Sequence, residues 1–304
     1  MPVSTPEPAA PERVLQRLDW QVIRRLDGLL QGDYRSLFYG RGVDFADLRE
    51  YQPEDDIRYI DWNVTARMDA PYVRQYREDR EITGWFLLDL SPSMDFGAGP
   101  ARQLKRTVLI DFVTTLARLL TRHGNRVGAL FADGSRRVER ALPARSGKLH
   151  VLRLIHTLQR QPALPRAPFT DLTPLLEAGL RSIQRRALIF VISDFISAPG
   201  WERPLHLLSR RHEVLAVRLW DPRETELPDV GPVLVEDAET GEQLYVDTHD
   251  PQFRRRFQAA AAQREAALAT AFRHAGVEAL NLATTDDLVR AIVRFAALRR
   301  QHRR

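Results

Sequence analysis

The chain has 304 residues, of which 44% are hydrophobic and none is cysteine. This length allows one large domain or a domain with a smaller companion, and the lack of cysteine excludes disulfides, zinc–thiolate sites, iron–sulfur clusters and cysteine catalysis. The net charge of +5 raises the possibility of nucleic-acid binding. Arginine supplies nearly all of the positive charge, and 40 acidic residues are interspersed with it, so a composition bias of the genome explains the charge at least as well.

The hydropathy pattern and the N-terminus predict where the protein resides. No apolar run approaches the roughly 20 residues that span a bilayer. Residues 1–8 lack the basic region and the apolar region of a signal peptide. We therefore expect a soluble, cytoplasmic protein without membrane insertion, and the absence of disulfides fits a reducing cytosol.

The first 80 residues contain three kinds of sequence. Residues 1–11 are rich in proline, alanine and glutamate and are expected to be disordered. Apolar residues at helical spacing then predict a helix from Pro11 to Leu30. Residues 33–80 mix acids and arginines with aromatic residues and keep neither the helical nor the strand period. We expect an irregular layer there, with one strand at Tyr72–Tyr76 leading into the core domain.

Three acidic residues in this layer allow two interpretations. Asp55, Asp56 and Asp61 would form a second metal cluster if their side chains converged. The alternative, which the pattern favours, is that they cap turns or form ion pairs with the arginines of the same layer, Arg49, Arg58 and Arg67.

From Glu81 onward, strand patterns alternate with helix patterns. The runs Trp85–Leu90 and Leu188–Ile192 are almost continuously apolar, which is typical of strands buried on both faces of a parallel sheet. The other predicted strands are 126–131, 137–141, 214–219 and 277–282, with a hairpin at 233–246. The predicted helices are 104–122, 148–158, 172–180, 201–211, 251–275 and 288–298.

This alternation predicts an α/β fold with a doubly wound, mainly parallel sheet of Rossmann type and helices on both faces. A smaller helical and irregular segment precedes it. The expected divisions are a disordered N-terminus at 1–11, an N-terminal segment at 12–80 and the α/β domain at 81–300.

Oxygen-bearing side chains follow both of the most apolar strands. Asp89, Ser91 and Ser93 come at the end of the first, and Ser193 and Asp194 come at the end of the second. In doubly wound folds, ligands bind beyond the carboxyl ends of the strands, where the strand order changes direction. If the two strands are neighbours, these side chains converge at such a place.

A threonine from a third loop completes the predicted cluster. Thr170 follows a proline-rich loop and precedes a helical run, whereas its rival Thr173 lies inside that run, so we favour Thr170. With Asp89, Ser91, Ser93 and Asp194 it offers the oxygen ligands that suit Mg²⁺, or Mn²⁺ or Ca²⁺, with one position left open for an acidic side chain of a partner protein. The alternative is that the serines cap the following helix.

Two resemblances carry specific expectations. The residues Asp89-x-Ser91-x-Ser93, with Thr170 and Asp194, resemble the von Willebrand factor A domain and its metal-ion-dependent adhesion site. The stretch from Gly42 to Arg67 resembles the signature of the bacterial family of unknown function numbered 58, in which this segment is coupled to a von Willebrand A-like domain. Asp44 and Glu54 depart from that signature, at positions where the family usually has glutamate and glycine.

The family resemblance implies a partner and a role. Family members are typically encoded beside MoxR-type AAA+ ATPases and are thought to act with them in chaperone-like maturation of other proteins. Many relatives also carry N-terminal membrane helices, so this chain resembles a short soluble form. The function expected from the resemblance is a metal-dependent protein-interaction module, an adaptor or co-chaperone, and not an enzyme.

Two other functions are possible. A metal-dependent phosphohydrolase of the haloacid-dehalogenase type needs a second acid at the position that Ser91 occupies, and serine cannot serve as the general acid. Neither a Gly-x-Ser-x-Gly elbow nor a phosphate-binding P-loop is present in the sequence. A nucleic-acid-binding protein using its arginine-rich segments would show strongly salt-dependent affinity for DNA.

Overall fold

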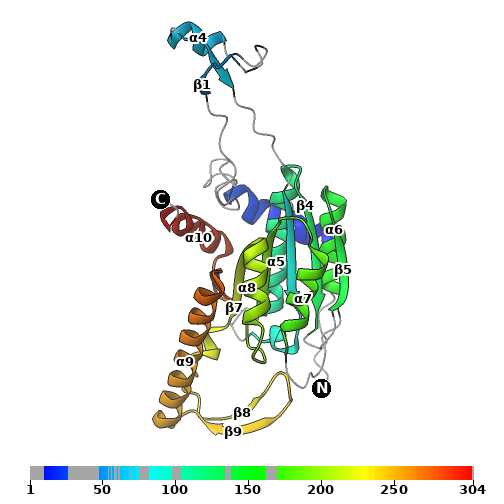
Figure 1. Cartoon of the computed structure of the whole chain (residues 1–304). Coiled ribbons are helices and arrows are strands. Elements are labelled where there is room, and N and C mark those ends of the chain that lie inside the picture. Colours follow the sequence, from blue (N-terminus) through cyan, green and yellow to red (C-terminus); the bar gives the residue numbers. More distant parts are fainter. Residues whose placement is uncertain are drawn as a thin grey trace. The chain divides into compact units, whose positions relative to one another are not determined.

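The computed structural model describes residues 10–26, 48–53, 55, 57, 60, 62–68, 70–74, 82–97, 104–133, 138–161 and 170–302 (Figure 1). Contacts divide the chain into two compact units, residues 32–81 and the remainder, residues 1–31 with 82–304. We describe each unit by itself. Apart from residues 10 and 11, the segment for which disorder is expected lies outside the described residues.

A six-stranded sheet forms the centre of the larger unit. Its strands are β3 (Thr83–Asp89), β4 (Arg126–Ala132), β5 (Val138–Arg145), β6 (Leu188–Ser193), β7 (Glu213–Trp220) and β10 (Glu278–Ala283). They lie in the order β10-β7-β6-β3-β4-β5, and all neighbours are parallel except β4 and β5. The prediction of an α/β fold with a mainly parallel sheet is confirmed.

Helices cover both faces of this sheet (Figure 1). The helices of this unit are α1 (Pro11–Leu18), α5 (Lys105–Arg122), α6 (Lys148–Arg160), α7 (Thr173–Ser182), α8 (Glu202–Arg211), α9 (Pro251–Ala275) and α10 (Leu288–His302). On one face Phe86 and Phe190 stack, and Phe112 of α5 packs edge-on against Phe190. On the other face the next residues along the strands, Leu87 and Val191, join a core with α7 and α8. Alternate side chains therefore serve opposite faces, as the strand period requires.

The N-terminal elements differ in detail from the prediction. The first helix contains a π-helical segment, η1 (Asp19–Ile23), after α1. In the unit of residues 32–81, α4 (Trp62–Met68) lies between β1 (Leu48–Glu50) and β2 (Tyr72–Arg74), which pair antiparallel. The strand predicted at Tyr72–Tyr76 therefore belongs to a separate two-stranded sheet, because its ladder hydrogen bonds go to β1 instead of to β3.

Only one member of the suspected second acidic cluster can be placed. Asp55 accepts a hydrogen bond from the backbone N–H of Gln52 at 2.9 Å, as an acid at a turn does. Asp56 and Asp61 lie outside the described residues. In the part of the chain that the structure describes, no helix is both long and apolar enough to cross a membrane.

The strand order reverses direction at one position in the sheet. From β3 the chain proceeds to β4 and β5 on one side, and then crosses to β6 on the other side and continues to β7 and β10. The direction of progress thus reverses between β3 and β6, whose carboxyl ends lie next to each other. Crevices of this kind are where open α/β sheets bind ligands.

Candidate functional site

Asp89, the last residue of β3, joins the ends of the two central strands. Its side chain is fully buried. Its Oδ1 accepts a hydrogen bond from the backbone N–H of Ser91 at 3.0 Å, and its Oδ2 accepts one from the Oγ of Ser193 at 2.6 Å. Because Ser193 ends β6, this carboxylate fixes the carboxyl ends of β3 and β6 to each other.

The two predicted serines lie in the loop that follows β3. Pro92 starts a short 3₁₀ helix, η3 (Pro92–Asp95), which brings the Oγ atoms of Ser91 and Ser93 to 3.1 Å from each other. Arg106 of α5 holds this loop in place, since it binds both carboxylate oxygens of Asp95 and donates to the backbone carbonyl of Leu90 at 3.1 Å. The serine hydroxyls therefore occupy a fixed position beside Asp89.

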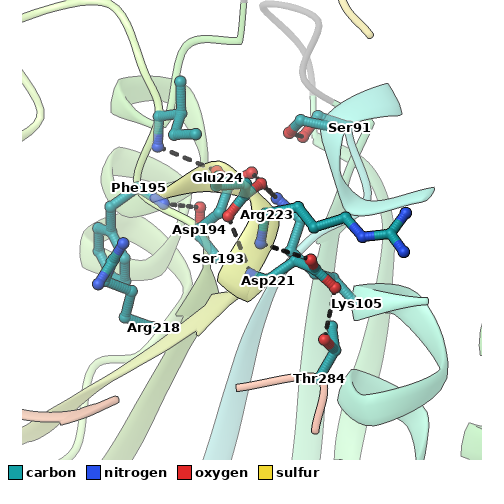
Figure 2. A network of polar contacts seen from close by, with 12 residues as sticks. Ser91, Lys105, Ser193, Asp194, Phe195, Arg218, Asp221, Arg223, Glu224 and Thr284 are labelled. Carbon is teal, nitrogen blue, oxygen red and sulfur yellow. Dashed lines mark hydrogen bonds and ion pairs between the residues drawn. The ribbon is translucent and has the colours of Figure 1, made fainter. Parts of the chain in front are cut away.

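Asp194, directly after β6, pairs with a buried lysine that the sequence analysis missed. Its Oδ2 accepts from the Nζ of Lys105 at 2.7 Å, and its Oδ1 accepts from the backbone N–H of Ile196 at 2.9 Å. The Nζ of Lys105 also donates to Glu224 at 2.6 Å (Figure 2). The sequence does contain a signal for this lysine. Lys105 lies on the apolar stripe of its helix with Leu109 and Phe112, and a buried lysine needs acidic partners.

Glu224 is held by a second cluster, at the end of β7. Asp221 begins the 3₁₀ helix η4 (Pro222–Glu224) with a capping box, in which its Oδ1 accepts from the N–H of Arg223 and Glu224 accepts from the N–H of Asp221. The Oδ2 of Asp221 accepts from the Oγ1 of Thr284 at 2.6 Å (Figure 2). This cap fixes the Glu224 carboxylate where Lys105 can reach it.

Thr170 lies in the third loop, just before α7. Its backbone carbonyl accepts from the N–H of Ala198 at 2.8 Å, which ties this loop to the one that follows Asp194. The side chain is buried, and its Oγ1 has no hydrogen-bond partner within the described ranges. The rival Thr173 begins α7 itself. The structure therefore joins Asp89, Ser91 and Ser93 directly, and links Thr170 to the loop after Asp194 through backbone.

One more acid reaches this place from far along the chain. Glu239 lies in the turn of the hairpin made by β8 (Pro232–Glu236) and β9 (Gln243–Asp247). Its Oε1 accepts from the backbone N–H of Ser93 at 3.1 Å, and its Oε2 is buried without a partner in the portion of the chain described. The sequence gives no signal for this contact, because an acid in a hairpin turn is ordinary.

The comparisons identify the family. Residues 47–267 match the family described as "Protein of unknown function DUF58". The chain belongs to this family. The predicted resemblance to it is confirmed, and the DUF58 match includes Asp89, Ser91, Ser93, Thr170 and Asp194.

Two relatives of this DUF58 chain come from mycobacteria. An uncharacterized protein of Mycobacterium tuberculosis is 40% identical over 287 residues, which cover 94% of this chain and 89% of that protein. One of Mycobacterium avium is 41% identical over 160 residues, covering 53% of this chain and 94% of that protein. Among solved structures, the conserved hypothetical protein BatB of Bacteroides thetaiotaomicron aligns with a TM-score of 0.44 and 13% identity over 72% of this chain and 99% of that one.

Negative charge exceeds positive charge around this DUF58 site. Burial and the charge of Asp194 raise the pKa of Asp89 to about 6, against the effect of its hydrogen bonds with Ser193 and Ser91. Burial lowers the pKa of Lys105, but Asp194 and Glu224 outweigh it and hold that pKa above its ordinary value. The ammonium is thus the positive partner of two carboxylates, while Asp89 and Glu239 add further acidic charge.

Proposed function

We propose that this DUF58 chain is a metal-dependent protein-interaction module with a doubly wound sheet and a cation site of the von Willebrand factor A type. The observation that carries the proposal is the buried cluster of hydroxyls and carboxylates at the carboxyl ends of β3 and β6, where acids outnumber the ammonium of Lys105. The reversal of strand order between these two strands supports it, because such sheets bind ligands there.

The donor set fits a hard divalent cation. Across the described ranges, no group of three or more histidines and acids is arranged to hold a metal, so a cation would depend on hydroxyl ligands. The orphaned Oγ1 of Thr170 is such a ligand. Both carboxylate oxygens of Asp194 already accept hydrogen bonds, so this acid would act through its charge and through water, as Mg²⁺ sites allow.

The proposed ligands of Mg²⁺, or of Mn²⁺ or Ca²⁺, are Asp89, Ser91, Ser93, Thr170 and Asp194. When bound, the cation would supply an electrophilic coordination position for a carboxylate of a partner protein. Hydrogen bonds within the chain hold the proposed ligands in place. Arg106 donates to the backbone of the serine loop, Ser193 donates to the Asp89 carboxylate, and Lys105 donates to Asp194.

We propose a binding role and not catalysis. Asp89 is fully buried and both of its oxygens accept internal hydrogen bonds, an arrangement unsuited to a phosphate-accepting nucleophile. For the partner we propose a MoxR-type AAA+ ATPase, with the chain as its adaptor or co-chaperone in the maturation or assembly of other proteins. This choice of partner rests on the family resemblance.

The partner claim is tested by retention of a MoxR-type AAA+ ATPase on the immobilised full chain. We expect retention in Mg²⁺, loss of retention in EDTA, and loss with Asp89→Asn. Glu242→Gln, which removes an exposed acid of the hairpin, is the matched control and should retain the ATPase. Retention that is equal with and without EDTA would contradict the proposal.

A further inference from the structure

The hairpin β8–β9 is built to present Glu239. In its turn, the Oδ1 of Asp237 accepts from the backbone N–H groups of Glu239 and Thr240, and from the Thr240 hydroxyl, all within 3.0 Å. Asp237 thereby orders the turn through contacts within the hairpin itself. Glu239 then contacts Ser93, which lies 146 positions earlier in the sequence.

The rest of the hairpin is loosely attached to the domain. Leu234 and Tyr245, which face each other across the two strands, are 59% and 71% exposed. The two sides of the base are joined by Thr248, whose Oγ1 donates to the carbonyl of Gly231 at 2.7 Å. The base is held to α9 by Arg254, which donates to the backbone carbonyl of Thr248. A ribbon with a fixed base and exposed strands can lift its tip without disturbing the core.

The contact at the tip points to a cation. One oxygen of Glu239 is used by the Ser93 amide, and the other is buried with no partner in the described part of the chain. A buried carboxylate oxygen without a donor is costly. A divalent cation among the serine hydroxyls would remove this cost.

We propose that Glu239 is an internal acidic ligand of the site. It occupies, from the same chain, the open position that the proposed function assigns to a partner's carboxylate, and the partner gains access when the hairpin tip lifts. This inference rests on the proposed function and adds a regulatory step to it: the free module is closed by its own hairpin.

Two measurements with opposite expected signs test this role. Glu239→Gln keeps an oxygen that can accept from the Ser93 amide but removes the charge, so Mn²⁺ affinity measured by calorimetry should fall about tenfold. At saturating Mn²⁺ the same variant should retain the AAA+ ATPase several-fold better, because the internal competitor is weakened. A merely structural role would lower both. Glu242→Gln should change neither.

A spectroscopic readout locates the tip directly. Since the chain lacks cysteine, Ala238→Cys gives a single position for a fluorine label next to Glu239. Mn²⁺ in the site should strongly shorten the transverse relaxation time of that fluorine, and adding Glu239→Gln should reverse much of the effect.

The outcomes separate the two claims. If wild type binds Mn²⁺ and Glu239→Gln binds it equally well, with unchanged fluorine relaxation, the internal ligand is wrong while the cation site stands. If wild type binds neither Mn²⁺ nor Mg²⁺, the proposed function is wrong and the internal ligand falls with it.

Discussion

Two aspartates occupy equivalent places at the carboxyl edge of the sheet but have different surroundings. Asp221 follows β7, and its oxygens accept from Arg223 and Thr284 in a closed capping box. Asp89 ends β3, and two residues whose backbone or side chain contacts the loops of its cluster, Thr170 and Glu239, each have a buried oxygen that lacks a partner among the described residues. A cluster in which these groups are paired serves the fold, whereas one with surplus acids and orphaned oxygens is a candidate for binding.

The two clusters meet at Lys105, so the strongest test of the comparison is to remove its charge. Lys105→Met leaves Asp194 and Glu224 as acids without their cation, and breaking a buried pair in this way costs about 3–5 kcal/mol. Urea unfolding of the metal-free protein measures this loss. Arg181→Met, which breaks the exposed pair with Glu177, should cost less than about 0.5 kcal/mol.

A loss below roughly 1 kcal/mol for Lys105→Met would show that the ammonium is not the link that holds the two clusters together.

The next largest expected difference in stability is between variants of two threonines, one from each cluster. Thr284→Val removes a hydroxyl that donates to the Asp221 carboxylate, and hydrogen bonds to charged groups contribute about 1.5–3 kcal/mol. Thr170→Val removes a hydroxyl without a partner in the described part of the chain, so its metal-free stability should stay within about 0.5 kcal/mol of wild type.

The stabilisation that Mg²⁺ adds should depend on Thr170 and not on Thr284. Thr170→Val should lose most of the stabilisation by the cation, and Thr284→Val should keep it. Equal losses from both threonines in metal-free urea unfolding would mean that the two clusters do not differ in the way described.

The clamp on the serine loop has the smallest expected effect on stability. Arg106→Met removes its contacts with Asp95 and with the Leu90 carbonyl, and because this ion pair is partly exposed we expect a loss of about 1 kcal/mol. Mg²⁺ affinity should fall with it, since the serine hydroxyls lose their fixed position. Unchanged calorimetric affinity would contradict the positioning role of Arg106.

The elements of the fold were largely predictable because they depend on local pattern. The buried parallel strands at Trp85–Leu90 and Leu188–Ile192 are nearly all apolar, and Gly276, with φ of 67°, ends α9 at the predicted place. The strand predicted at Tyr72 is present, but its alternating pattern does not say that β1 supplies its hydrogen bonds.

The site was only partly predictable, because several of its contacts join residues far apart in the sequence and leave no local pattern. Asp89 and Asp194 follow recognisable strands, so the sequence places them at one edge of the sheet. Lys105 and Glu224 lie 119 positions apart, and Glu239 reaches Ser93 only through the tertiary path of the hairpin. Lys105 left a signal on the apolar stripe of its helix, whereas Glu239 left none.

The most direct test of the central claim is a Mg²⁺ titration of the wild-type chain and of Asp89→Asn by calorimetry, with urea unfolding at the same concentrations. The account predicts one bound cation for wild type and, at a free concentration of 100 times Kd, a stabilisation of about 2.7 kcal/mol. Asp89→Asn should show neither effect. Absence of binding by wild type, or equal binding by both proteins, would contradict the account.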